Sequence, residues 1–123
     1  MPRSRFFVPS CSVVLLSMCI GLSGCHSAFV QATVSNHSGK AIRIFELDYP
    51  NASFGSGDFA DGAEYRYRFK ILDTGQAKLL WTDAAGHDHT VQGPAMHEGQ
   101  EGTLAVTIGP ETATWKTDLH SAR

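Results

Sequence analysis

The stretch Glu64-Tyr65-Arg66-Tyr67-Arg68-Phe69-Lys70-Ile71 alternates strictly between charged and apolar side chains. In a β-strand, successive side chains point to opposite faces, so this pattern gives the strand one apolar face and one charged face. Such a strand is typical of an antiparallel sheet that packs one face on a core and exposes the other to water. Residues 64–71 therefore predict a half-buried strand.

Turn residues divide the rest of the chain into segments of similar length. Seven short strands are predicted, and they cover residues 29–34, 41–49, 64–71, 78–82, 89–92, 103–108 and 112–119. No run of ten residues combines a helical period of apolar residues with helix caps. Seven strands with a turn roughly every 8–12 residues are typical of a sandwich of the immunoglobulin or fibronectin III type. The sequence therefore predicts an all-β fold, an antiparallel β-sandwich, with a small closed β-barrel as the alternative.

Local patterns also predict how these strands connect and where they are irregular. The turn residues at 36–40 predict a hairpin between the first two strands, and residues 50–62 predict a loop of about a dozen residues. Gly93-Pro94 predicts the end of the fifth strand. Within residues 41–49 the apolar positions change parity, so we expect a bulge or twist near Phe45-Glu46.

The start of the chain has the parts of an export signal. Two arginines make the first residues positive, and residues 6–25 contain no charged residue. A helix over residues 6–22 would be about 25 Å long, which is shorter than the roughly 30 Å hydrocarbon core of a membrane. Pro9 and Gly21 also interrupt it. We therefore predict a cleaved signal peptide and not a membrane-spanning helix.

The end of this leader, Leu22-Ser23-Gly24-Cys25, resembles the lipobox of bacterial lipoprotein precursors. The resemblance implies cleavage between Gly24 and Cys25, a diacylglyceryl thioether on the sulfur of Cys25, and an acyl chain on its new amino group. No other cofactor is expected. His26, where an Asp would favour the inner membrane, resembles the lipoproteins that are sorted to the outer membrane. The resemblance thus implies an exported protein anchored in the outer membrane and facing the periplasm. No family resemblance extends into residues 26–123.

This reading divides the chain into four parts. Residues 1–24 are the signal peptide, 25–27 are the acylated cysteine and a very short tether, 28–119 are the sandwich domain, and 120–123 are a tail that frays. The tether spans only about 10 Å when fully extended. We therefore expect the N-terminal end of the sandwich to face the membrane lipid.

The composition of the mature chain excludes several classes of function. The leader holds two arginines and no acid, so its removal takes the formal net charge from −2 to −4. An acidic body is a poor binder of nucleic acid, because phosphate contacts need clustered Lys and Arg. Its overall charge makes it equally unpromising as an electrostatic binder of anionic lipid, so the acyl chains are the expected anchor. Of the three cysteines, Cys11 and Cys19 lie in the leader and Cys25 carries the lipid. The mature domain therefore has no disulfide, no cysteine nucleophile and no zinc site built on cysteines.

Histidines and carboxylates are the candidate chemical groups. His87-Asp88-His89 puts two imidazoles on one strand face, which suits zinc or copper, although no third ligand stands at a motif spacing. Pairs of acids could serve a small hydrolase, but the sequence gives no pair in which one acid is buried and the other is exposed. Both kinds of residue are also common in solvated turns. The paired acids are Glu46 with Asp48, Asp58 with Asp61, and Glu98 with Glu101.

Two further groups are expected to be structural. The basic row formed by Arg66, Arg68 and Lys70 predicts a solvated strand face, with acids such as Glu46 and Asp48 opposite it on a neighbouring strand. Contact with an acidic partner or polymer is the alternative. Trp81 and Trp115 are expected in the core.

Since no set of catalytic groups converges, the sequence favours a non-catalytic structural or interaction module anchored in the cell envelope. The membrane is the expected partner through the lipid anchor, and an envelope protein is the second. A metal-binding periplasmic protein using His87 and His89 is one alternative. A small hydrolase using carboxylates is the other.

Overall fold

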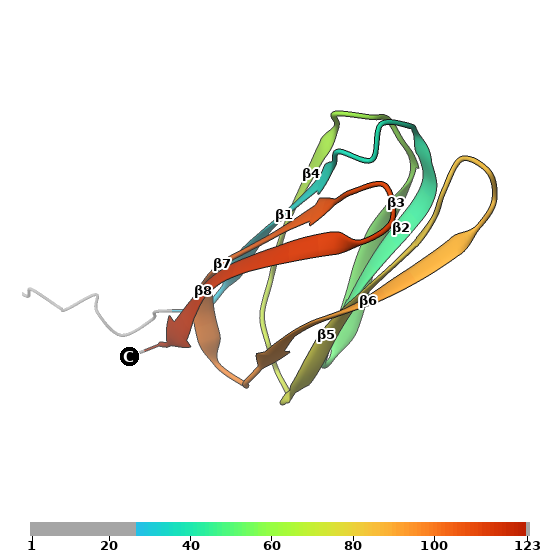
Figure 1. Cartoon of the computed structure of the whole chain (residues 1–123). Coiled ribbons are helices and arrows are strands. Elements are labelled where there is room, and N and C mark those ends of the chain that lie inside the picture. Colours follow the sequence, from blue (N-terminus) through green and yellow to red (C-terminus); the bar gives the residue numbers. More distant parts are fainter. Residues whose placement is uncertain (1–26, 123) are drawn as a thin grey trace, which may run out of the picture.

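The computed structural model describes residues 27–122, which form two packed β-sheets (Figure 1). The strands in chain order are β1 Val30–Asn36, β2 Ile42–Tyr49, β3 Ala52–Phe59, β4 Glu64–Phe69, β5 Gly75–Thr82, β6 Asp88–Met96, β7 Gln100–Ile108 and β8 Ala113–Ser121. One sheet has the order β4-β1-β7-β8 and the other has the order β3-β2-β5-β6. The predicted β-sandwich is confirmed, with eight strands where seven were expected. Within residues 27–122 no helix is long and apolar enough to cross a membrane.

Alternating side chains build the core between the two sheets. Val30, Ala32 and Val34 of β1 are fully buried, as the pattern of residues 29–34 predicts. The inner face of β7 is equally apolar and consists of Leu104, Val106 and Ile108. Burying one such aliphatic side chain contributes about 1.5–3 kcal/mol relative to leaving it exposed. β1 and β7 are the two central strands of their sheet, so these buried side chains lie in the middle of the core.

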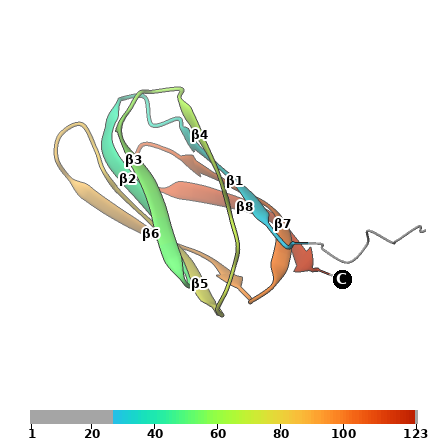
Figure 2. The same cartoon turned by 180° about the vertical axis from the view of Figure 1, so that it is seen from behind.

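β4 and β3 are edge strands of the two sheets and lie on the same side of the sandwich (Figure 2). A cluster of aromatic side chains closes the sandwich along this edge. The ring of Phe54 stacks on that of Tyr67 with centroids 4.4 Å apart, and Tyr49 stacks on Phe69 at 4.0 Å. Phe69 is buried, whereas Tyr67 is 37% exposed. The apolar face predicted for residues 64–71 is therefore a core face that is partly open to water in the middle of the edge strand β4.

The predicted hairpin between the first two strands is wrong. β1 and β2 belong to different sheets, and residues 37–41 carry the chain from one sheet to the other. β1 pairs instead with β4 in an antiparallel manner and with β7 in a parallel manner. A cluster of turn residues signals that the chain reverses, but it does not say which sheet receives the next strand.

Residues 50–62 are not the predicted loop, because they contain β3. This strand pairs with β2 along its whole length, from Ala52 opposite Tyr49 to Phe59 opposite Ile42. Its glycines and serines give it the composition of a loop, but Phe54 and Phe59 are buried in the core. Backbone bonds to β2 and two buried rings thus outweigh the weak strand propensity of the residues between them.

The change of face in β2 lies at Arg43-Ile44, just before the predicted position. Ile42 and Phe45 are both buried, so the two residues between them point outward, and Ile44 is 53% exposed. In β3, Asp58 adopts a φ of 46°, a left-handed conformation that is uncommon for residues other than glycine. Both strands therefore change face at the same level, which keeps Ile42 and Phe59 paired in the core.

Gly93-Pro94 does not end β6, contrary to the sequence prediction. The pairing with β5 shifts between Gln76 and Lys78, so that Gly93 and Pro94 together lie opposite a single residue. Proline is tolerated at such a bulge on an edge strand. A side chain at position 93 would collide with the indole of Trp115, so the glycine provides the space that this ring fills.

β8 continues to Ser121, beyond the point where fraying was predicted. His120 pairs with Glu101 and Ser121 pairs with Gln100. The end of β8 lies beside the start of β1, and we call this the terminal end of the sandwich (Figure 1). The connections β1–β2, β3–β4, β5–β6 and β7–β8 lie at the opposite end, which we call the loop end.

Asn36 links the loop end of the two sheets. Among the described residues, Asn36 is the polar residue that is buried, and it has no exposed surface. Its Nδ2 donates to the carbonyl oxygens of Lys40 at 2.9 Å and Phe59 at 3.0 Å. Its Oδ1 accepts from the backbone N–H and the hydroxyl of Ser38. The backbone N–H of Asn36 donates to Ala63, so one residue ties β1 to three other segments.

We expect Asn36→Ala to lower the free energy of unfolding by about 2–4 kcal/mol, because it leaves buried carbonyl groups without a donor. Asn51→Ala is the matched control. Asn51 makes a similar pair of bonds, to Lys70 and Leu72, but it is exposed and water can replace them. Asn51→Ala should therefore lower the free energy of unfolding by less than about 1 kcal/mol. Urea unfolding followed by tryptophan fluorescence measures both, and equal costs would contradict the role given to Asn36.

Candidate functional site

The predicted lipidation and cleavage residues, Cys25 and Gly24, lie outside the described residues. The structure does place the segment that follows them. Ser27 to Phe29 lead directly into β1 at the terminal end of the sandwich. That end is therefore the part of the domain closest in sequence to Cys25.

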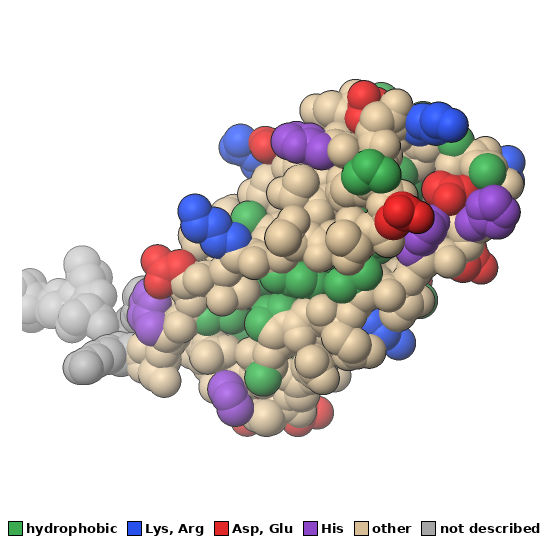
Figure 3. Space-filling model, in the orientation of Figure 1, with side chains coloured by type: hydrophobic (Ala, Val, Ile, Leu, Met, Phe, Trp, Pro, Cys, Tyr) green, Lys and Arg blue, Asp and Glu red, His purple; other side chains and the backbone are tan. Residues whose placement is uncertain are grey.

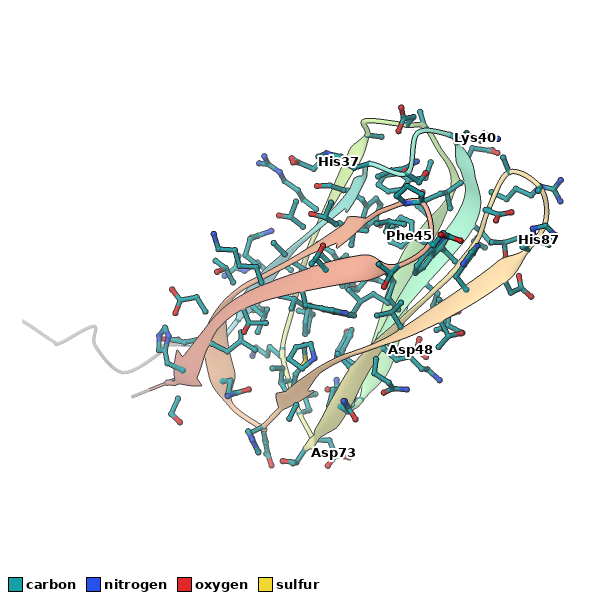
Figure 4. All side chains as sticks on the ribbon, viewed as in Figure 1. His37, Lys40, Phe45, Asp48, Asp73 and His87 are labelled. Atoms are coloured by element: carbon teal, nitrogen blue, oxygen red, sulfur yellow. The ribbon has the colours of Figure 1, made fainter. Side chains whose placement is uncertain are left out.

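The two candidate metal ligands lie at the loop end. His87 is in the β5–β6 turn (Figure 4), and His89 is the second residue of β6. His87 is largely exposed, and its Nδ1 lies 3.7 Å from Asp83 Oδ2. His89 is half-buried, and its Nε2 lies 2.9 Å from the same oxygen. The ring of His89 also stacks on Trp81 with centroids 4.8 Å apart. Within residues 27–122 no group of three His, Cys, Asp or Glu side chains is arranged to hold a metal ion.

Asp83 organises this turn. Its Oδ1 accepts the backbone N–H groups of Ala85 and His87, both at 2.9 Å, while its own N–H donates to the carbonyl of His87. The hydrogen bond to His89 and those to the backbone lower the pKa of Asp83 from 3.8 to about 2. Gly86 takes a φ of 89°, which closes the loop. The histidine cluster is therefore built around an acid that holds a hairpin together.

The paired carboxylates occupy different places and do not converge. Glu46 and Asp48 lie on the outer face of β2, where the neighbouring Asp48 raises the pKa of Glu46. Lys78 Nζ lies 3.9 Å from Asp48 Oδ2. At the loop end, Asp61 accepts the backbone N–H of Gly39. The other acids are Asp58 in β3, Glu98 in the β6–β7 turn, and Glu101 in β7.

The acids predicted opposite the basic row are not there, because β4 and β2 lie in different sheets. Arg66 pairs instead with Glu64 of its own strand, at 3.0 Å. The guanidinium of Arg68 lies over the ring of Phe29, 3.9 Å from its centroid, and Lys70 Nζ lies 5.0 Å from the same centroid. The basic row therefore ends on an aromatic ring at the terminal end.

The two tryptophans take different positions in the core. Trp81 is 2% exposed, as predicted, whereas Trp115 is only half-buried. Figure 3 shows apolar side chains along the seam between the two sheets. Trp115 and Leu119 of β8 and Val91 of β6 are half-buried hydrophobic residues that pack on the core. The indole N–H of Trp115 is buried without a hydrogen-bond partner among the described residues.

A hollow of about 320 Å³ on the outer face of the β3-β2-β5-β6 sheet was not predicted. Ile44 and Leu80 give it an apolar floor, and we call it the Ile44 hollow. The pairing register sets Ile44 beside Thr82 and Glu46 beside Leu80. The polar rim consists of Glu46, Thr82, Asp88 and Thr90. The change of parity in residues 41–49 was the available signal, because the parity of Phe45, Leu47 and Tyr49 leaves Ile44 outside.

The hydroxyl of Thr82 in this rim donates to Asp88 Oδ1 at 2.6 Å. On the β3 side, Ile44 pairs with Gly57 and Glu46 pairs with Gly55, and neither glycine carries a side chain. An exposed isoleucine thus stands beside bare backbone on one side and hydroxyl and carboxylate groups on the other. Such a surface can bind an apolar group and exchange polar contacts at its border.

The fold defines the chain as a small β-sandwich domain. No protein-family model and no curated protein matches it. Among solved structures it is similar to a crystal structure of a Bacteroides uniformis protein that is provisionally described as a cell adhesion protein. The identity is 9%, the match covers 76% of this chain and 50% of that chain, and the TM-score is 0.45. This chain therefore spans about half of that protein, and a likeness at this level carries no functional argument.

We expect Asp83→Asn to make stability less dependent on pH, because asparagine keeps an acceptor for the turn but has no charge. With its pKa lowered, ionised Asp83 stabilises the fold above pH 3.8, and this contribution is lost as the pH falls toward 2. The urea midpoint of the wild type should therefore exceed that of the variant at about pH 6, and the two should converge toward pH 2. Asp118→Asn, at an exposed acid of β8, is the control. A difference for Asp83→Asn that stays constant with pH would contradict this role.

Proposed function

We propose that this protein is a lipid-anchored, non-catalytic binding module of the cell envelope. The observation that carries the proposal is the short distance between the lipobox and the fold. Cys25 precedes β1 by only five residues, so the acyl chains and the sandwich are joined almost directly. One acyl chain binds a membrane reversibly, whereas two or three give a lasting anchor. A domain held this way stays at the membrane surface and acts on what comes into contact with it.

The non-catalytic part of the proposal rests on the arrangement of the polar groups. Hydrolysis by a nucleophile or by paired acids needs several polar groups that converge in one pocket. Asp83 and His89 are close, but they hold a hairpin turn, and their neighbours are backbone groups and an indole ring. Glu46 and Asp48 lie on an open strand face beside Lys78. These contacts support a binding role over the hydrolase and the metal carrier.

The Ile44 hollow is the proposed binding face. Isolated exposed apolar residues are common, but here an exposed isoleucine and a half-buried leucine share one concave surface. Its border is acidic through Glu46 and Asp88, with Asp48 close by. Charge complementarity therefore favours an envelope protein that presents an apolar side chain flanked by lysine or arginine.

We expect Cys25→Ser to abolish incorporation of radiolabelled palmitate and to release the protein from the membrane fraction. The physical reason is that the thioether can form only on the sulfur of Cys25. Cys19→Ser is the matched control, since it makes the same change inside the leader and should leave both labelling and membrane association unchanged. The anchoring proposal would be contradicted if the Cys25→Ser protein took up no palmitate and still associated with the membrane at the wild-type level.

We expect Ile44→Lys to remove partner binding, because it places a charge on the apolar floor of the hollow. A photocrosslinking amino acid at Thr90, on the rim, should capture an envelope protein in cells that carry the otherwise native chain. Leu72→Lys is the control, since Leu72 is similarly exposed at 61% but lies in the β4–β5 connection. Crosslinking should be lost in the first variant and kept in the second. A crosslinked product that survives Ile44→Lys would rule out this face.

A further inference from the structure

A second hollow, of about 440 Å³, lies on the β4-β1-β7-β8 sheet at the terminal end. Its lining includes Phe29, Gln31, Arg68, Glu101, Thr103 and His120, and we call it the Phe29 hollow. The register brings these residues together, because Gln31 pairs with Arg68 on one side and with Thr103 on the other. Glu101 pairs with His120 on the next level. All four strands of this sheet therefore contribute to one surface, next to residues 27–29, which precede β1.

The positive charge of this hollow is held in place by an aromatic ring. Arg68 lies 3.9 Å and Lys70 5.0 Å from the centroid of the Phe29 ring. Within residues 27–122 neither cation forms an ion pair with a carboxylate, and both are exposed. The acid in the hollow, Glu101, lies beside His120, whose Nε2 is 3.4 Å from Glu101 Oε2. Two oriented cations thus face solvent at this point, and the exposed Thr103 can add a hydroxyl donor.

The position of the hollow along the chain decides what it meets. Phe29 is four residues after Cys25, so a fully extended chain keeps the two residues within about 14 Å. The polar headgroup layer on each side of a membrane is about 5–8 Å thick. With Cys25 held by its acyl chains at the inner boundary of that layer, Phe29 would lie at most about 9 Å beyond the headgroups, and the hollow could reach the lipid phosphates.

We propose that the Phe29 hollow binds the phosphate of an anionic phospholipid in the membrane that holds the acyl chains. This inference rests on the proposed function, because the anchor brings the lipid within reach. Arg68 and Lys70 contact the phosphate, Thr103 donates to it, and Phe29 lies at the level of the headgroups. Binding there turns the β4-β1-β7-β8 sheet toward the bilayer. The Ile44 hollow, on the outer face of the other sheet, then faces away from the membrane and stays open to a partner.

The orientation can be measured on the acylated protein, which has no free cysteine once the leader is removed. Thr33→Cys, on the outer face of β1, and Thr90→Cys, on β6, each take a fluorescent label. The labelled protein is placed in phosphatidylcholine vesicles with or without about 30% phosphatidylglycerol. A spin label on the lipid headgroups quenches fluorophores near the surface. We expect strong quenching at position 33 and weak quenching at position 90, and only in vesicles that contain the anionic lipid.

The double variant Arg68→Gln/Lys70→Gln should reduce quenching at position 33 to the level at position 90. Each cation near an anionic surface changes a binding equilibrium about fivefold. Loss of two cations should therefore lower about thirtyfold the ratio of molecules whose β4-β1-β7-β8 sheet faces the bilayer to molecules that are freely oriented. Arg43→Gln/Lys78→Gln removes the same charge from the outer face of the β3-β2-β5-β6 sheet and should leave quenching unchanged. Arg68→Lys/Lys70→Arg should restore it.

Equal quenching at both positions, or quenching that survives Arg68→Gln/Lys70→Gln, overturns this inference. Quenching that is equally strong in pure phosphatidylcholine overturns it as well, because the anionic headgroup would then have no part. These failures differ from a failure of the proposed function, in which the protein carries no acyl chain and does not sediment with the vesicles at all. Thermal unfolding of each variant confirms that the exposed substitutions leave the fold intact.

Discussion

The structure depends on the point where the chain passes from one sheet to the other. Asn36 ends β1 there and is fully buried, and its side-chain amide donates to the carbonyl of Lys40 within the connecting segment and to the carbonyl of Phe59 at the end of β3. A buried polar group is costly unless it is fully hydrogen-bonded, and when it is satisfied it specifies one arrangement of the segments around it. The two sheets are thus held in one relative position at the loop end, and the aliphatic core fills the space between them.

This packing separates two surfaces with different properties. The outer face of the β4-β1-β7-β8 sheet carries Arg68 and Lys70 around Phe29, close to the start of the fold. The outer face of the β3-β2-β5-β6 sheet carries Ile44 and Leu80 with an acidic border. Because the sheets pack through their inner faces, these surfaces point in opposite directions. With the proposed acyl tether, the domain would contact lipid through one surface and a protein through the other.

The two histidines predicted as metal ligands lie around an acid that holds a hairpin turn together. His87 and His89 gather around Asp83 because the hairpin loop needs an acceptor for the N–H groups of Ala85 and His87. The stacking of His89 on Trp81 extends the core to the edge of the sheet. Spacing alone could not separate these roles, since a metal site and a capped turn both place imidazoles beside a carboxylate.

The sequence by itself determined the all-β class and the inward faces of residues 30–34 and 104–108, and it carries the resemblance to the lipobox. These features are local, because a period of two and a run of apolar residues are readable from a few neighbours. Only the tertiary structure decided that β1 and β2 part, that residues 52–59 are a strand, and that Ile44 is exposed. Pairing partners are chosen by contacts far apart in the chain, and a strand rich in glycine is stabilised by its neighbours more than by its own residues.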